Sequence, residues 1–112
     1  MAQTISQSNP KALVRMATGR ILDTGTVAAM TITLGFKPRW VRILNNSGLC
    51  TEEWIEGMAD ASGLKVVDSG SGTSDVIAIT SNGITPLDYG FTLGLDTDIL
   101  VSSEQLTWVA LG

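Results

Sequence analysis

Residues 90–112 read GFTLGLDTDILVSSEQLTWVALG and end in an apolar segment, LTWVAL, at 106–111. Side chains of a β-strand alternate between two faces. One face of this segment receives Leu106, Trp108 and Ala110, and the other receives Thr107, Val109 and Leu111. Both faces are mostly apolar, so the strand is either central in a layered fold or part of a contact between subunits. Because the chain offers no helices to cover it, we expect a subunit contact that includes Val109 and Leu111.

Short segments of the same kind precede this strand, and turn signals separate them. DTG, NNSG, SNG and LDYG fall at 23–25, 45–48, 81–83 and 87–90. Between them, VAAMTITLG (27–35), WVRILN (40–45) and DVIAIT (75–80) alternate and are rich in β-branched residues. This spacing predicts an all-β chain with one antiparallel β-sandwich or jelly-roll-like domain over residues 11–112.

One segment is ambiguous. TEEWIEGMADA (51–61) is compatible with a short helix, because Trp54 and Met58 are four residues apart. It also alternates as a strand would, and Gly57 weakens a helix. We therefore predict a strand here.

The first ten residues, MAQTISQSNP, are polar and rich in Gln and Ser. They lack the basic flank and apolar centre of a signal peptide. No apolar run in the chain is long enough to span a membrane. We expect residues 1–10 to form an extended arm that contacts a neighbouring molecule, with Gln3 and Pro10 among the contact residues.

The composition points to assembly with other chains. Charged residues are only 16% of the 112 residues, so a lone domain would have difficulty covering itself with polar surface. The net charge of −4 argues against direct binding of nucleic acid. Residues 11–42 have a charge balance of +5 and residues 43–112 one of −9. Such a division suits a basic region that docks on acidic surface, including that of an identical chain.

The basic region contains the most distinctive run, GFKPRWVRILN at 35–45. Here Trp40 lies between two arginines, which favours contacts with carboxylates and cation–π stacking. We expect this run to contact a neighbouring subunit or another particle protein. The expected interface residues are Lys37, Arg39, Trp40 and Arg42.

Catalytic and metal-binding motifs are not apparent in the sequence. It has no histidine, and its single cysteine, Cys50, stands beside acidic residues that raise a thiol pKa. A lone cysteine also excludes an intramolecular disulfide, which is compatible with folding in a reducing cytoplasm. We expect no enzymatic activity, no cofactor and no metal.

Two groups of carboxylates leave alternatives open. The four acids of TEEWIEGMAD (51–60) are expected to be solvated, although Glu53 and Asp60 beside Trp54 are also suited to holding a sugar. Asp96 and Asp98 are expected to close a turn through their side chains. Whether these two aspartates bind an ion is not decided by their spacing.

Several of these runs resemble segments of small virion proteins of tailed bacteriophages. The matching runs are LGFKPRWVRILN, EWIEGM, SNGIT and the closing GFTLGLDTDILVSSEQLTWVALG, and together they cover about residues 25–112. In that group a GF-x-P strand pairs with a late GFT-[LI]-G strand. The motifs mark structure, and no catalytic motif carries over.

The resemblance implies a β-sandwich or jelly-roll-like domain that assembles on the particle as a homo-oligomer, with a trimer expected. A capsid decoration or cement protein that binds the major capsid protein is the first function it implies. Such a protein is made in the host cytoplasm and resides in the virion. The alternative is a tail-fibre or tail-spike module that contacts surface carbohydrate.

Overall fold

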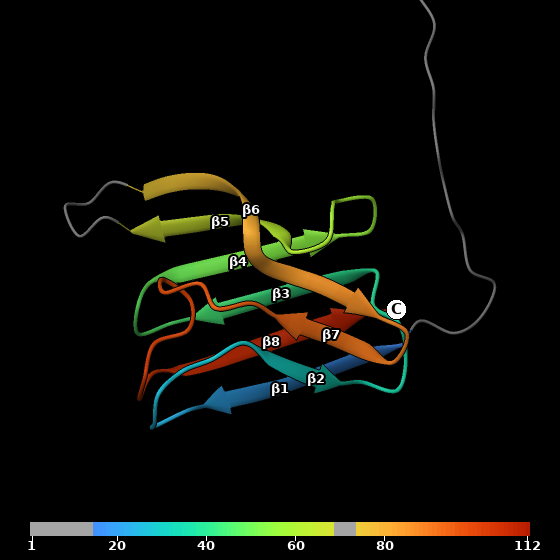
Figure 1. Ribbon diagram of the computed structural model, residues 1–112, viewed down its shortest axis with the longest axis horizontal. Coiled ribbons are helices and arrows are strands. Elements are labelled where there is room, and N and C mark those ends of the chain that lie inside the picture. Colours follow the sequence, from blue (N-terminus) through green and yellow to red (C-terminus); the bar gives the residue numbers. More distant parts are fainter. Residues whose placement is uncertain (1–14, 69–73) are drawn as a thin grey trace, which may run out of the picture.

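The computed structural model describes residues 15–68 and 74–112 (Figure 1). These residues contain strands and turns but no helix, so none of them forms a helical membrane span. The strands are β1 (Met16–Leu22), β2 (Met30–Thr33), β3 (Trp40–Asn45), β4 (Cys50–Ile55), β5 (Ser62–Asp68), β6 (Ser74–Leu87), β7 (Gly90–Leu93) and β8 (Gln105–Leu111). The prediction of an all-β chain is confirmed.

The eight strands form a single antiparallel sheet in the order β1-β8-β3-β4-β5-β6-β7-β2. The closing strand β8 is therefore not at an edge. It pairs with β1 on one side, where Trp108 faces Gly19, and with β3 on the other, where Trp108 faces Ile43. Residues 106–111 are thus paired through their backbone on both sides.

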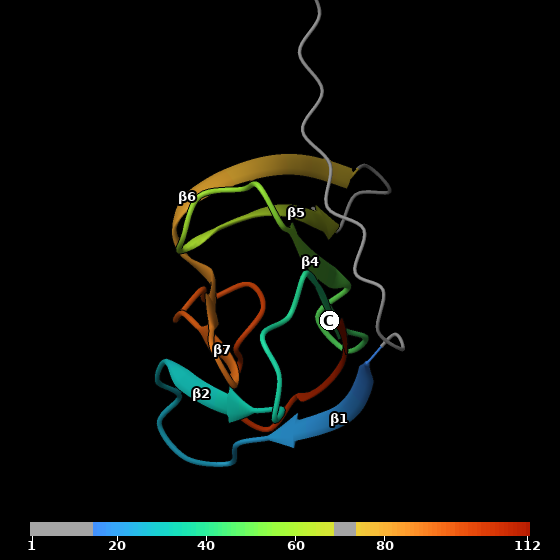
Figure 2. The same ribbon diagram turned by 90° about the vertical axis from the view of Figure 1, so that its right-hand side faces the viewer.

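The sheet curls because β6 is long and changes partner along its length. It pairs with β5 as far as Ile79 and again at Ile84, with an irregularity between Ser62 and Gly63. From Ile84 to Leu87, β6 pairs with β7. Gly83 lies at the bend, where an added Cβ would come within 2.2 Å of the Ser62 carbonyl oxygen. The bend turns β7 and β2 to face β8 and β1, as Figures 1 and 2 show from two sides.

The concave side of the curled sheet holds the hydrophobic core. Its fully or almost fully buried members are Val41, Ile43, Cys50, Trp54, Ile84, Phe91, Leu93, Ile99, Leu100, Leu106 and Ala110. The alternation predicted for residues 40–45 is confirmed, since Val41 and Ile43 are buried and Arg42 is exposed. In β8 the inner face carries Leu106 and Ala110, and Trp108 packs against the same core.

The predicted strand over residues 51–61 is right only in its first half. β4 ends at Ile55, and a turn follows in which Gly57 adopts a φ of 107°. This left-handed backbone conformation is favourable for glycine and breaks the extended chain. The prediction of a strand continuing to residue 61 was therefore wrong.

Candidate functional site

The convex side of the sheet, which we call the outer face, collects four of the predicted interface residues. Cross-strand partners point to the same side of a sheet. Trp40 is paired with Leu111, and Arg42 is paired with Val109, across the β3–β8 ladder. Trp40, Arg42, Val109 and Leu111 thus form two adjacent rows, although almost seventy residues separate the two strands in the sequence.

Exposed apolar side chains surround these two rows. The large ones on the outer face that are at least 40% exposed are Met16 (66%), Leu22 (59%), Leu44 (40%), Ile55 (49%), Leu64 (43%) and Val76 (65%). The register aligns them with the outer face of β1, β3, β4, β5 and β6. With Val109 and Leu111 of β8 between β1 and β3, the apolar side chains extend over six neighbouring strands, which is unusual for a chain that works alone.

An open groove of about 700 Å³ crosses this outer face over β1, β8 and β3. Arg20, Arg42, Leu44 and Val109 are among the residues that line it, and none of the lining residues in the described part of the chain is acidic. The groove therefore combines apolar walls with two guanidinium groups. This chemistry suits a partner surface that is apolar and acidic.

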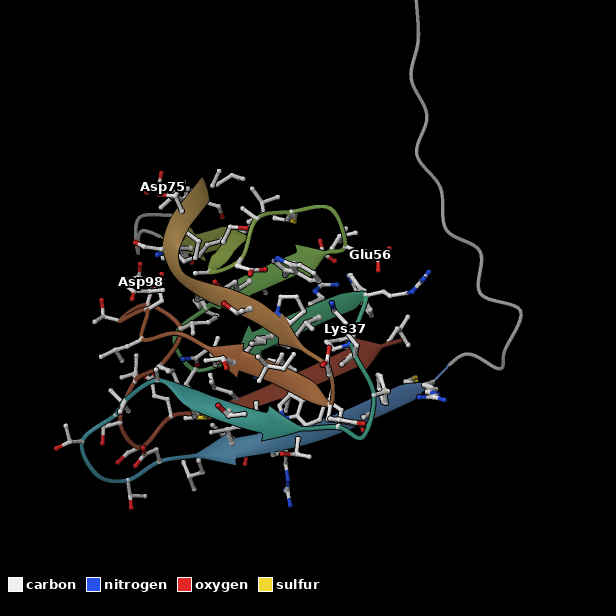
Figure 3. The ribbon with its side chains drawn as sticks, turned by 45° about the vertical axis from the view of Figure 1, so that its right-hand side comes forward. Lys37, Glu56, Asp75 and Asp98 are labelled. Atoms are coloured by element: carbon white, nitrogen blue, oxygen red, sulfur yellow. The ribbon has the colours of Figure 1, made fainter. Side chains whose placement is uncertain are left out.

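The remaining predicted interface residues lie elsewhere. Arg39 Nε lies 3.7 Å from Glu56 Oε2, so Arg39 has a carboxylate partner within its own chain. Lys37 is exposed in the connection before β3, and Figure 3 shows it at the same end of the sheet as Glu56. Gln3 and Pro10 belong to the predicted arm, which lies outside the described residues.

A second group of polar side chains lies inside the curl. Lys65 of β5 is only 6% exposed, and its Nζ donates hydrogen bonds to Asp96 Oδ1 (3.1 Å), Asp96 Oδ2 (3.0 Å) and Asp98 Oδ2 (2.7 Å). Burial lowers the pKa of Lys65, but the hydrogen bonds to Asp98 and Asp96 outweigh burial and raise it. The ammonium group is therefore held in its charged form. Lys65 was not among the expected site residues, although its place in β5 on the same face as Val67 was an available signal.

The two aspartates close a turn, as the sequence predicted. The backbone N–H of Asp98 donates to Asp96 Oδ1 over 2.9 Å. Within residues 15–68 and 74–112, no three acidic, cysteine or histidine side chains are grouped as metal ligands. The positive charge beside Asp96 and Asp98 comes from Lys65.

Glu52 contradicts the expectation of a solvated acidic segment. The alternation of β4 turns it inward between Cys50 and Trp54, and it is fully buried. Neither of its carboxyl oxygens has a hydrogen-bond partner among the described residues. Burial, reinforced by the charge of Asp96 and only partly offset by Lys65, raises the pKa of Glu52 to about 8. Glu52 is therefore a buried acid that holds its proton at neutral pH.

The buried acid makes the stability of the protein depend on pH. In the unfolded chain Glu52 loses its proton near pH 4.5, whereas the folded protein retains it to about pH 8. We expect the free energy of unfolding to fall as pH rises between these values, by up to about 1.4 kcal/mol per pH unit. Urea unfolding at several pH values measures this slope. Glu52→Gln should flatten the slope, and an equally steep slope in this variant would contradict the assignment.

The neighbouring Cys50 shows no sign of an activated thiol. It is 1% exposed, and burial is the main cause that raises its pKa to about 11. A thiol in this state is a weak nucleophile.

The residues suggested for sugar binding are not arranged for that role. Trp54 is 3% exposed, and its Nε1 donates to the carbonyl of Ala59 over 3.1 Å. Its ring therefore has no free face on which a sugar could stack. Glu53 points to the outer face and accepts a hydrogen bond from Trp40 Nε1 over 2.6 Å, while Asp60 is exposed.

Comparison with known proteins adds no relative: no family model, no curated protein and no solved structure matches the chain.

Proposed function

We propose that this chain is a non-enzymatic structural protein of a tailed-bacteriophage particle, a decoration or cement protein that binds the capsid as a homo-oligomer. The observation that carries the proposal is the outer face. Residues singled out as interface residues from separate parts of the sequence, Trp40 and Arg42 on one strand and Val109 and Leu111 on another, lie there in adjacent rows. The resemblance of the sequence to small virion proteins supplies the setting.

The outer face suits adhesion because it combines apolar area with positive charge. Burying apolar surface contributes about 25 cal/mol for each Å² removed from water. Arg20 and Arg42 add selectivity for acidic partners, and residues 43–112 of a second copy carry ten acidic side chains. Of these, Glu52 and Asp96 are buried. Contacts that are weak singly become strong when many copies bind one particle.

The finer structural assignments are part of the same proposal. We infer that the curled sheet is a form of the jelly-roll-like sandwich that the resemblance implies and that three copies associate. The tail-fibre alternative gains no support from Trp54, because its ring is buried.

The experiment mixes the purified chain with shells assembled from the major capsid protein of the same genome and measures binding by sedimentation. We expect the wild-type chain to sediment with the shells and to saturate. Arg20→Glu should weaken binding about tenfold, which corresponds to 1.4 kcal/mol. Arg20 is a suitable position because it is exposed and faces Thr107, so the change creates no like-charge pair across the ladder.

Thr31→Glu is the control, because it adds a carboxylate at an exposed position of β2 that does not line the groove over β1, β8 and β3. It should bind as the wild type does. Shells that sediment without the wild-type chain would contradict the proposal.

A further inference from the structure

The buried ion pair between Lys65 and Asp96 holds an amine nitrogen beside a carboxyl group. Lys65 Nζ lies 3.1 Å and 3.0 Å from the two carboxyl oxygens of Asp96. A nitrogen almost equidistant from both oxygens forms a bidentate ion pair, which keeps it close to the carbon that joins them. Both residues are buried, with exposed fractions of 6% and 9%. Reacting groups held this close and shielded from water react far faster than free groups do.

The second observation is that the carboxyl group of Glu52 is fully buried beside this pair. Glu52 lies directly opposite Lys65 in the β4–β5 ladder, so the two side chains point to the same side. A Lys–Asp ion pair does not require a fully buried carboxyl group beside it. Burying a carboxyl group without a hydrogen-bond partner costs folding free energy. Burial keeps Glu52 protonated at neutral pH by raising its pKa to about 8. A protonated carboxyl group can donate a proton and, once ionised, accept one. Neither Glu52 oxygen is hydrogen-bonded among the described residues, so its side chain has to rotate toward Lys65 and Asp96 to exchange protons with them.

The backbone supplies a third element. The N–H of Asp98 donates to Asp96 Oδ1 over 2.9 Å. Negative charge develops on this oxygen when an amine attacks the carboxyl carbon, and a fixed N–H donor stabilises such charge. The side chain of Asp98, 2.7 Å from Lys65 Nζ, holds the lysine in place.

We propose that Lys65 and Asp96 join in an intramolecular isopeptide bond, with Glu52 as the proton relay. Glu52 gives its proton to Oδ2 of Asp96 and, as a carboxylate, takes one from the Lys65 ammonium. The neutral amine then attacks the carboxyl carbon of Asp96, and the N–Cγ bond forms. A second proton passes from the nitrogen through Glu52 to Oδ2, the Cγ–Oδ2 bond breaks, and water leaves. The products are one amide, one water molecule and protonated Glu52, and no oxidant or reductant is needed.

The bond ties the middle of β5 to the connection between β7 and β8. It replaces a buried ammonium and a buried carboxylate by a neutral amide, which removes two charges from the interior. It also closes a covalent loop from residue 65 to residue 96, which restricts the unfolded chain. A subunit of an assembly under mechanical load benefits from such a crosslink.

Mass spectrometry of the purified full-length protein, denatured and digested with trypsin, tests the proposal. Lys65 is the only Lys or Arg after Arg42, so an unmodified chain yields fragments 43–65 and 66–112. Trypsin does not cleave after a lysine whose amine forms an amide. We therefore expect one product that spans residues 43–112. Its mass should be lower by one water molecule than that of the same uncleaved peptide without the crosslink.

Variants assign the roles of the three carboxylates. Glu52→Gln and Asp96→Ala should both yield the two separate fragments, whereas Asp98→Asn should retain the crosslinked product because its backbone N–H remains. Wild-type protein that yields fragments 43–65 and 66–112 would overturn the proposal, whatever the folding of the variants. A crosslink that persists in Asp96→Ala would overturn the assignment to Asp96.

Discussion

Phe91→Ala is expected to lower the free energy of unfolding by about 3–5 kcal/mol, the usual cost of truncating a buried aromatic ring. Phe91 is fully buried where β7 faces β8. Its ring meets that of Trp108 edge to face, with centroids 5.7 Å apart and planes at 79°. Because small domains have only about 5–15 kcal/mol of stability in total, the variant should be largely unfolded at modest urea concentrations. Urea unfolding followed by circular dichroism measures the change.

Tyr89→Ala is the matched control for this variant. Tyr89 is also aromatic and lies two residues earlier, but it is 71% exposed. Its removal should change the free energy of unfolding by less than about 0.5 kcal/mol, as is usual for surface positions. Equal losses in the two variants would show that the ring of Phe91 is not the contact between the two ends of the curled sheet.

Aspartate at two consecutive positions of β8 should have opposite consequences. Ala110 is fully buried on the inner face, and Ala110→Asp would place an unpaired carboxylate in the core. A buried charge without a partner costs several kcal/mol, so this variant should not fold. Val109 lies on the outer face opposite Arg42, so Val109→Asp should leave the strands intact.

Circular dichroism distinguishes the two variants. The Val109→Asp spectrum should match that of the wild type, and the Ala110→Asp spectrum should show loss of strand structure. If Ala110→Asp folds normally or Val109→Asp does not, the assignment of the two faces of β8 is wrong.

The alternation of side chains in β8 was readable from the sequence, but its position in the sheet was not. Leu106, Trp108 and Ala110 were expected to share a face, and they do share the inner one. Which strands would flank β8 depends on pairings with β1 and β3, which are distant in the sequence. No local pattern specifies such pairings, so the sequence could not show that β8 lies between β1 and β3, and the subunit contact expected at Val109 and Leu111 stays a prediction.

The interior cluster was missed for a different reason. Residue type places glutamate and lysine at the surface in most proteins, and four acids within ten residues reinforced that expectation. Alternation along β4 already placed Glu52 on the same side as Trp54, so the pattern contradicted the residue type. The structure follows the pattern, because a strand cannot turn one side chain outward without shifting its register.

Self-association of the wild-type chain tests the central claim, that the outer face is an assembly surface, most directly. Light scattering at micromolar concentration should give a multiple of the 11.8 kDa chain mass for the wild type. Val109→Asp should give the mass of one chain while keeping its native circular dichroism. A wild-type mass of 11.8 kDa, or a Val109→Asp assembly as large as that of the wild type, would contradict the claim.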